Sequence, residues 1–381
     1  MQPNNRFLSI DILRGLVIAI MTVDHAREFF FKAIPIADPM DLSVVPWEVF
    51  LSRWIAHFCA PTFVFLAGVS AYLYGRKTGI TKQALSFHLL KRGLILILLE
   101  VTVINFAWSF TFPPEKLYLQ VIWVIGLSMI CLAGLIWLPV LAMVGIALAL
   151  VMAQHLLPEL IFPDGSFANT LWSILYHRNW MPLTDYLQVR TSYPLLPWIG
   201  IIALGYWAGK LFTPDFSPQK RQSLLTWTGL GLIGLFVCLR ATNVYGELNP
   251  FVISPQSPVQ TVMSFLNLTK YPPSFLFSLM ALGPALLLLR YFETSAGMVG
   301  NILLKFGRVP MFYYIIHLYV LHAACHITRF FLTIPDGVKY SVPHIGMVWL
   351  ITGLTLLATY PLVIWFTEIK AKSGKKWLSY I

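Results

Sequence analysis

Apolar runs of about 20 residues alternate with short polar connections along the whole 381-residue chain. An α-helix needs about 20 apolar residues to cross roughly 30 Å of hydrocarbon, whereas a transmembrane β-strand shows a short alternating pattern. The pattern therefore predicts an all-α, polytopic membrane protein that forms a single domain over residues 1–381. Ten transmembrane helices are expected, at 8–30, 48–74, 90–111, 117–136, 138–156, 195–213, 223–242, 273–292, 308–331 and 345–367.

Composition supports this class, because 57% of the residues are hydrophobic and only 11% are charged. So little polar surface cannot cover a soluble globule. The first apolar run is not expected to be a signal peptide, since Asp11 and Arg14 interrupt it and no small-residue cleavage site follows. The four cysteines lie in apolar segments without a CxxC pair, so neither a disulfide nor a zinc site is predicted.

The net charge of +11 is better explained by membrane topology than by binding to nucleic acid. With the predicted helices in place, sixteen of the 27 basic residues lie on one side of the membrane and ten on the other. Cytoplasmic connections carry the excess of Lys and Arg, so both termini are predicted to be cytoplasmic, in a cell (inner) membrane. The segments 31–47, 157–194 and 243–272 then face outward and can cap a cavity.

The first predicted helix carries ionisable residues that need an explanation. Asp11, Arg14, Asp24 and His25 interrupt an apolar run, where such groups are costly and mark functional sites. Arg14 and His25 are eleven residues apart, which places them on one helix face and about 16 Å apart along the axis. One elongated ligand with an anionic end, such as coenzyme A, could contact both residues.

Two further polar residues are expected to lie close to the helix face that carries Arg14 and His25. Glu100 has a predicted depth similar to that of Arg14, so we expect an ion pair, either as a brace between helices or as part of a cofactor tunnel. His57 approaches the outer side of the membrane at the depth of His25. Pro61 is expected to bend the helix that carries His57.

The ninth predicted helix contains two histidine-containing pairs. Tyr313 and His317 are four residues apart, as are His322 and His326, so each pair shares a face. The spacing resembles a two-histidine metal site, but no acidic third ligand accompanies it in the span. Hydrogen bonds between tyrosine and histidine are therefore favoured over a metal.

Aromatic and amide side chains near the outer side suit a sugar. Trp and Tyr also gather at any membrane interface, so a plain solvent loop is the alternative interpretation. The candidate substrate-binding residues are Asn105, Trp108, Trp172, His177, Trp180 and Trp198.

Four motifs, taken together, resemble a known family. They are SIDILRG at 9–15 followed by Asp24-His25, the run at 57–68, SYPLLPWIG at 192–200 and GRVPMFYYIIH at 307–317. In this order they resemble the catalytic domain of heparan-alpha-glucosaminide N-acetyltransferase and its bacterial relatives. The spacing of Arg14 and His25 also resembles the Arg/Lys-X10-His signature of acyltransferase-3 proteins.

The resemblance implies transfer of acetyl from cytosolic acetyl-CoA to a small amino sugar or glycan end beyond the membrane, with no metal. No large luminal domain is expected, so the acceptor need not be a polysaccharide. His25 is assigned as the base, with Asp24 and His57 beside it as catalytic residues. The residues assigned to the donor are Arg14, Asp11, Glu100, Tyr313 and His317.

The sequence is also compatible with other functions. A transporter or flippase for a sugar or lipid-linked sugar would use a similar set of helices, but the sequence contains no convincing internal repeat. An acyltransferase acting on hydroxyl groups is a further alternative. The sequence also leaves a homodimer open.

Overall fold

The computed structural model describes residues 7–31, 39–157, 160–335, 338, 340–373 and 378. The predicted cytoplasmic ends of the chain lie outside these residues. The contacts within the chain divide it into two compact units. Unit 1 contains the described residues of 60–250 and 268–290, and unit 2 those of 7–59, 251–267 and 291–378. The single domain expected over 1–381 stays a prediction.

The structure is mostly helical, and each of the ten predicted segments contains a helix. Within the described part of the chain, five helices are long and apolar enough to cross a membrane. The helix at Leu8–Phe30 is not among them, because it carries five acidic or basic residues. The protein is thus a helical membrane protein, while ten crossings stay a prediction. The five helices are Trp47–Gly75, Pro218–Thr242, Phe275–Thr294, Pro310–Phe331 and Ile345–Lys372.

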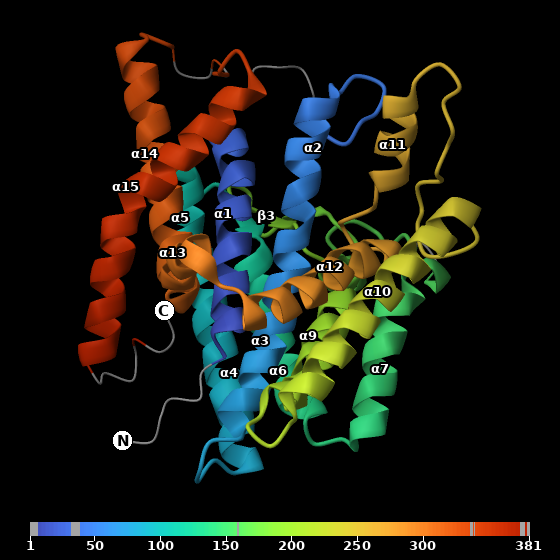
Figure 1. Ribbon diagram of the computed structural model, residues 1–381. Coiled ribbons are helices and arrows are strands. Elements are labelled where there is room, and N and C mark those ends of the chain that lie inside the picture. Colours follow the sequence, from blue (N-terminus) through green and yellow to red (C-terminus); the bar gives the residue numbers. More distant parts are fainter. Residues whose placement is uncertain are drawn as a thin grey trace. The chain divides into compact units, whose positions relative to one another are not determined.

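Unit 2 is organised around its first helix, α1, which packs against α13, α14 and α15 (Figure 1). Buried side chains occur around the whole circumference of α1, because several helices of the unit pack against it. The elements of this unit are α1 (Leu8–Phe30), α2 (Trp47–Ile55), the 3-10 turn η1 (Ala56–Phe58), α11 (Pro258–Leu266), α13 (Gly297–Arg308), α14 (Pro310–Phe331) and α15 (Ile345–Lys372).

Two glycines let the backbones of α1 and α13 touch. A Cβ atom at Gly15 would lie 1.9 Å from the carbonyl oxygen of Leu303, and one at Gly307 would lie 1.7 Å from that of Asp11. Both distances are far below van der Waals contact, so any larger residue would separate the helices. The motifs at 9–15 and 307–317 therefore meet at one helix crossing.

The second predicted helix is interrupted where the chain passes from unit 2 to unit 1. After α2, the turn η1 precedes α3 (Cys59–Gly75). Pro61 lacks a backbone N–H, and its ring displaces the carbonyl group four residues earlier, that of His57. This accounts for the tighter turn at 56–58. The bend expected at Pro61 stays a prediction.

Unit 1 holds the remaining helices. Gly93 and Gly126 bring α4 and α6 into backbone contact, because a Cβ at Gly93 would lie 2.5 Å from the carbonyl oxygen of Gly126. The helical elements are α3, α4 (Lys82–Leu99), the π-helical turn η2 (Glu100–Ile104), α5 (Asn105–Ser109), α6 (Val121–Leu135), α7 (Val140–Met152), η3 (Ala153–Leu156), α8 (Phe167–Leu175), α9 (Leu196–Ala208), η4 (Gly209–Phe212), α10 (Pro218–Thr242) and α12 (Phe275–Thr294).

Unit 1 also contains a small sheet, which corrects the all-α expectation to a mostly helical fold. Its strands are β1 (Lys116–Leu119), β2 (Trp180–Pro182) and β3 (Gln188–Thr191). Strand β3 lies in the middle, parallel to β1 and antiparallel to β2. The predicted helix at 117–136 therefore begins as β1 and becomes helical only at Val121. Strands of three or four residues are too short to show an alternating pattern in the sequence.

Candidate active site

The centre of the site in unit 2 is a contact between His25 of α1 and His317 of α14. His25 Nδ1 lies 2.7 Å from His317 Nε2. The two ring planes are nearly parallel, at 10°, with centroids 5.0 Å apart. Tyr314 packs edge-on to His25 at 5.8 Å. His25 is half-buried, whereas His317 is fully buried, so only His25 offers an imidazole to a ligand.

Further hydrogen bonds hold the buried end of this contact. His317 Nδ1 lies 2.8 Å from the carbonyl oxygen of Tyr313, whose ring stacks in parallel on the His317 ring at 5.0 Å. The hydroxyl groups of Tyr313 and Thr22 are 2.8 Å apart, and Thr22 Oγ1 donates to the carbonyl oxygen of Ile18. Tyr313 and Thr22 are also fully buried. The hydrogen bond predicted between Tyr313 and His317 is therefore corrected: His317 contacts the backbone carbonyl of Tyr313, and the Tyr313 hydroxyl contacts Thr22.

Asp24 makes ion pairs with two arginines. Its Oδ1 lies 3.2 Å from Arg27 Nη2, and its Oδ2 contacts Arg53 Nη1 on α2. Arg27 also contacts Glu28. These ion pairs give Asp24 a structural task, which is to join α1 to α2, and its catalytic role beside His25 stays a prediction. Sequence analysis did not assign a role to Arg53.

His57 lies deeper along α1 than His25. Arg53 contacts Asp24, and Cys59 Sγ lies 3.3 Å from the carbonyl oxygen of Val17, so α1 and the segment 47–59 run antiparallel. This register places His57 level with residues 19–20 of α1, about 8 Å from the level of His25 at 1.5 Å per residue. The equal depth expected for the two histidines is therefore corrected. His57 is only 1% exposed.

Arg14 and Asp11 lie at the crossing of α1 and α13, toward the other end of α1 from His25. Arg14 Nη1 lies 2.8 Å from Asp11 Oδ1, and Asp11 is 1% exposed. Arg308 directly follows Gly307, which packs on the backbone of Asp11. The Nε atom of Arg308 is buried and has no hydrogen-bond partner among the described residues. Sequence analysis did not single out Arg308, although it lies in the motif at 307–317.

Glu100 and Asn105 have structural partners in unit 1. Glu100 is fully buried at the start of the π-helical turn, and its Oε2 accepts a hydrogen bond from the N–H of Trp123 at 3.0 Å. A carboxylate at the first turn of α6 is favourable because free N–H groups point there. Asn105 donates to the carbonyl oxygen of Lys116 and accepts from the N–H of Tyr118, so it fixes β1. The ion pair between Arg14 and Glu100, which lie in different units, stays a prediction.

The remaining acceptor candidates lie at several places in unit 1. Trp180 on β2 is 37% exposed and faces Arg190 and Tyr118. Trp172 of α8 packs against Phe162 and Tyr176, and His177 beyond the end of α8 is exposed.

Trp198 of α9 is fully buried against Tyr193, so direct contact with a sugar would require these side chains to move. Trp108 is half-buried in α5.

His322 and His326 form the second pair on α14, as expected. Their Nε2 atoms are 3.1 Å apart, and His322 also packs against Phe29 of α1. Within the described ranges, no group of three or more His, Cys, Asp or Glu side chains is close enough to hold a metal ion.

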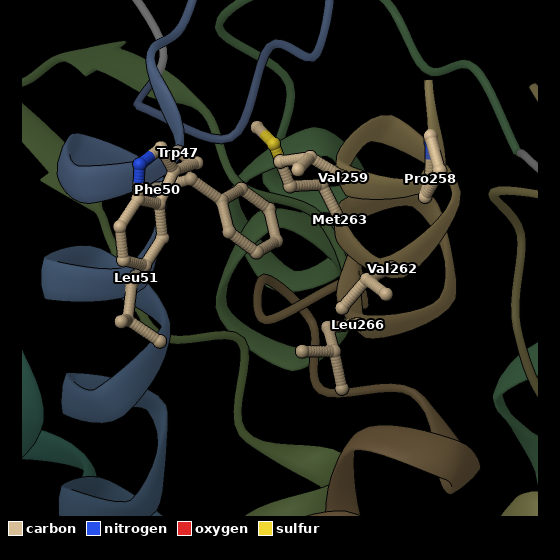
Figure 2. A pocket seen from close by; sticks show the side chains of 8 residues that line it. All are labelled: Trp47, Phe50, Leu51, Pro258, Val259, Val262, Met263 and Leu266. Atoms are coloured by element: carbon tan, nitrogen blue, oxygen red, sulfur yellow. The ribbon is translucent and has the colours of Figure 1, made fainter. Parts of the chain in front are cut away.

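Unit 2 also contains an apolar groove of about 400 Å³ between α2 and α11 (Figure 2). Trp47, Phe50 and Leu51 of α2 face five apolar residues of α11, from Pro258 to Leu266. The lining presents no group that could bind the phosphates of coenzyme A or the hydroxyl groups of a sugar. The groove is therefore separate from the histidine site in its chemistry.

Comparison with known families finds a match to the amino-terminal part of the chain. The profile described as heparan-alpha-glucosaminide N-acetyltransferase, catalytic, matches residues 6–244, which is more than half of the chain. The matched range contains the whole of α1, with Arg14 and His25, whereas His317 lies beyond it. No protein of curated function matches the chain.

Proposed function

The chain belongs to the heparan-alpha-glucosaminide N-acetyltransferase catalytic family, and from this premise we propose that it transfers acetyl from cytosolic acetyl-CoA to an amino sugar of the glucosamine type on the far side of a cell (inner) membrane. The observation that carries the proposal is the half-buried imidazole of His25, held by the fully buried His317. This side chain lies on the same α1 face as Arg14, about 16 Å away.

The reaction needs a base for the acceptor and stabilisation of negative charge. The acceptor nitrogen attacks the thioester carbonyl carbon, so a C–N bond forms as the C–S bond breaks. His25 takes the proton that the nitrogen loses. Coenzyme A departs as a thiolate and recovers a proton, which gives N-acetyl product and free coenzyme A. A route through an acetyl-histidine would use the same imidazole as the nucleophile.

Arg14 and Arg308 are proposed to bind the phosphate groups of the donor. They come from the α1–α13 crossing, and guanidinium groups suit phosphate because their N–H groups form paired hydrogen bonds. The acetyl end would then reach along α1 toward His25. Asp11 orients Arg14 through the 2.8 Å ion pair.

The acceptor is proposed to contact exposed groups of unit 1. Trp180 and His177 are accessible, and a tryptophan ring beside polar groups suits a sugar face. Asn105 fixes β1, which belongs to the same sheet as Trp180. Trp108, Trp172 and Trp198 are further candidates for the acceptor site. Transfer to a hydroxyl group would use the same base, so O-acylation is the alternative within this proposal.

The deciding experiment incubates purified protein with acetyl-CoA and a panel of amines, amino sugars and plain sugars, and follows release of free coenzyme A. We expect release with a glucosamine-type acceptor and an acetylated product of matching mass. Release with hydroxyl-only sugars would favour O-acylation. No turnover with any acceptor, together with sugar flux into protein-containing liposomes, would replace the enzyme proposal with a transporter.

A further inference from the structure

We propose that His317 is a positioning residue that holds His25 as the tautomer with hydrogen on Nδ1, so that His25 Nε2 is the nitrogen that reacts. The inference rests on the proposed function for its catalytic meaning. It goes beyond that function, because it names the reacting atom and gives His317 and Tyr313 a task other than contact with the donor.

The assignment starts at the buried end of the contact. The Tyr313 carbonyl oxygen, 2.8 Å from His317 Nδ1, can only accept a hydrogen bond, so Nδ1 of His317 carries hydrogen. A neutral imidazole has one N–H group, and therefore His317 Nε2 has a lone pair. That lone pair is directed at His25 Nδ1, 2.7 Å away.

His25 must then donate from Nδ1. In the neutral ring this leaves the lone pair of His25 on Nε2. General-base catalysis requires that lone pair, and so does attack by the imidazole on a thioester. The other tautomer would carry hydrogen on Nε2 and could perform neither step with that nitrogen. The contact therefore selects the reactive form of His25.

His317 is assigned as neutral because of its surroundings. It is 0% exposed, and within the described part of the chain its hydrogen bonds and ring contacts are with His25, Tyr313 and Tyr314, none of which supplies a negative charge. A buried imidazolium there would lose its hydration without gaining a counter-ion. The charge that develops in the reaction consequently stays on the half-buried His25, and His317 orients that ring without taking its proton.

Tyr313 and Thr22 hold His317 in place. Thr22 Oγ1 gives its hydrogen to the Ile18 carbonyl oxygen, so it accepts from the Tyr313 hydroxyl at 2.8 Å. The Tyr313 ring is thereby fixed to α1 and stacks in parallel on His317. The Nδ1 end of the His317 imidazole is thus held by fully buried groups, and its Nε2 end faces the half-buried His25. A ring fixed at both nitrogens is the arrangement that a single tautomer requires.

The test is nitrogen NMR of protein labelled with 15N-histidine, because protonated and unprotonated ring nitrogens resonate far apart. A spectrum of His25→Gln protein identifies the His25 signals. We expect wild-type His25 to carry hydrogen on Nδ1 and none on Nε2 at a pH where the ring is neutral. The reverse assignment would overturn the proposal without any reference to turnover, even if the His317 variants fold poorly.

Two variants of His317 separate orientation from packing. His317→Phe keeps a stacked ring but removes the acceptor, so His25 should shift toward hydrogen on Nε2 and kcat should fall about 10- to 100-fold. His317→Gln retains an acceptor oxygen, so this variant should keep most of the wild-type His25 tautomer and most of the wild-type kcat. His322→Phe replaces another buried histidine on α14 and is the matched control. It should change neither the His25 tautomer nor kcat. An unchanged His25 tautomer in His317→Phe contradicts the proposal.

Discussion

At the scale of single residues, His25 and His57 differ in what they can reach. His25 is half-buried and is held through its Nδ1, whereas His57 is 1% exposed and lies about one and a half helical turns deeper. A base must come within hydrogen-bond distance of the acceptor's proton. The geometry therefore favours His25 as the base, with His57 as a buried residue that supports the packing around it.

Replacement of the two histidines tests this ranking. A positioned general base contributes about 10²–10⁴ in rate, so His25→Ala should lower kcat by at least about 10² while acetyl-CoA still binds. His57→Ala should lose less. Coenzyme A release measures kcat, and calorimetry measures donor binding. Near-normal turnover in His25→Ala with none in His57→Ala would transfer the base to His57.

Arg14 should matter more for the donor than for the acceptor. Arg14→Ala removes a proposed phosphate contact, so we expect the Kd of acetyl-CoA to rise while the KM of the acceptor changes little. The same change takes the cation away from Asp11, which is 1% exposed, and this can cost roughly 3–5 kcal/mol of stability.

The control for Arg14 separates binding from folding. Combining Arg14→Ala with Asp11→Asn removes both charges and should recover much of the lost thermal stability without restoring donor affinity. If folded Arg14→Ala protein binds acetyl-CoA as tightly as wild type, Arg14 serves only the ion pair.

At the scale of elements, the site depends on how closely α1 and α13 pack. Gly307→Ala would place a Cβ atom 1.7 Å from the Asp11 carbonyl oxygen, so the helices must separate. We expect a loss of about 3 kcal/mol or more in the free energy of unfolding, measured by thermal unfolding in detergent. The substitution should weaken donor binding as well, because Arg14 and Arg308 lie at this crossing.

Gly353→Ala in α15 is the matched control for Gly307→Ala. No atom lies within 4 Å of the Cβ that it would add. Alanine favours a helix over glycine by about 0.5–1 kcal/mol, so this variant should be equally or more stable. Equal stability of the two variants would show that the close crossing is not required.

The helices were predictable, whereas several contacts between them were not. Apolar runs and the Arg14–His25 stripe depend on local helix geometry, and both can be read along the chain. The contact of His25 with His317 joins positions 292 residues apart, and neither residue's neighbours signal the other. Thr22 carries no charge and merges with its apolar run. For Glu100 the sequence suggested an ion pair with Arg14, which stays a prediction, and it gave no sign of the hydrogen bond from the N–H of Trp123 in α6.

At the scale of the whole molecule, the distribution of charge sets the direction of the proposed reaction. Sixteen of the 27 basic residues lie on the side assigned to the cytoplasm. Acetyl-CoA is highly charged and cannot cross hydrocarbon unaided, so the end of α1 that carries Arg14 must face the compartment that holds the donor. The orientation of the chain in the membrane therefore determines the direction of acetyl transfer, and one experiment tests both.

Single cysteines at two exposed positions test that orientation. Phe167→Cys lies in the predicted outer segment 157–194 and Gln83→Cys in the predicted inner connection at 75–92; both avoid the helix-capping residues Ser166 and Thr81. The exposed Cys238 is first replaced by alanine to lower the background. In intact cells, a membrane-impermeant maleimide should label Phe167→Cys and not Gln83→Cys, and permeabilised cells should show both. The opposite pattern in intact cells would reverse the orientation, and Arg14 would then lie on the side that lacks the donor.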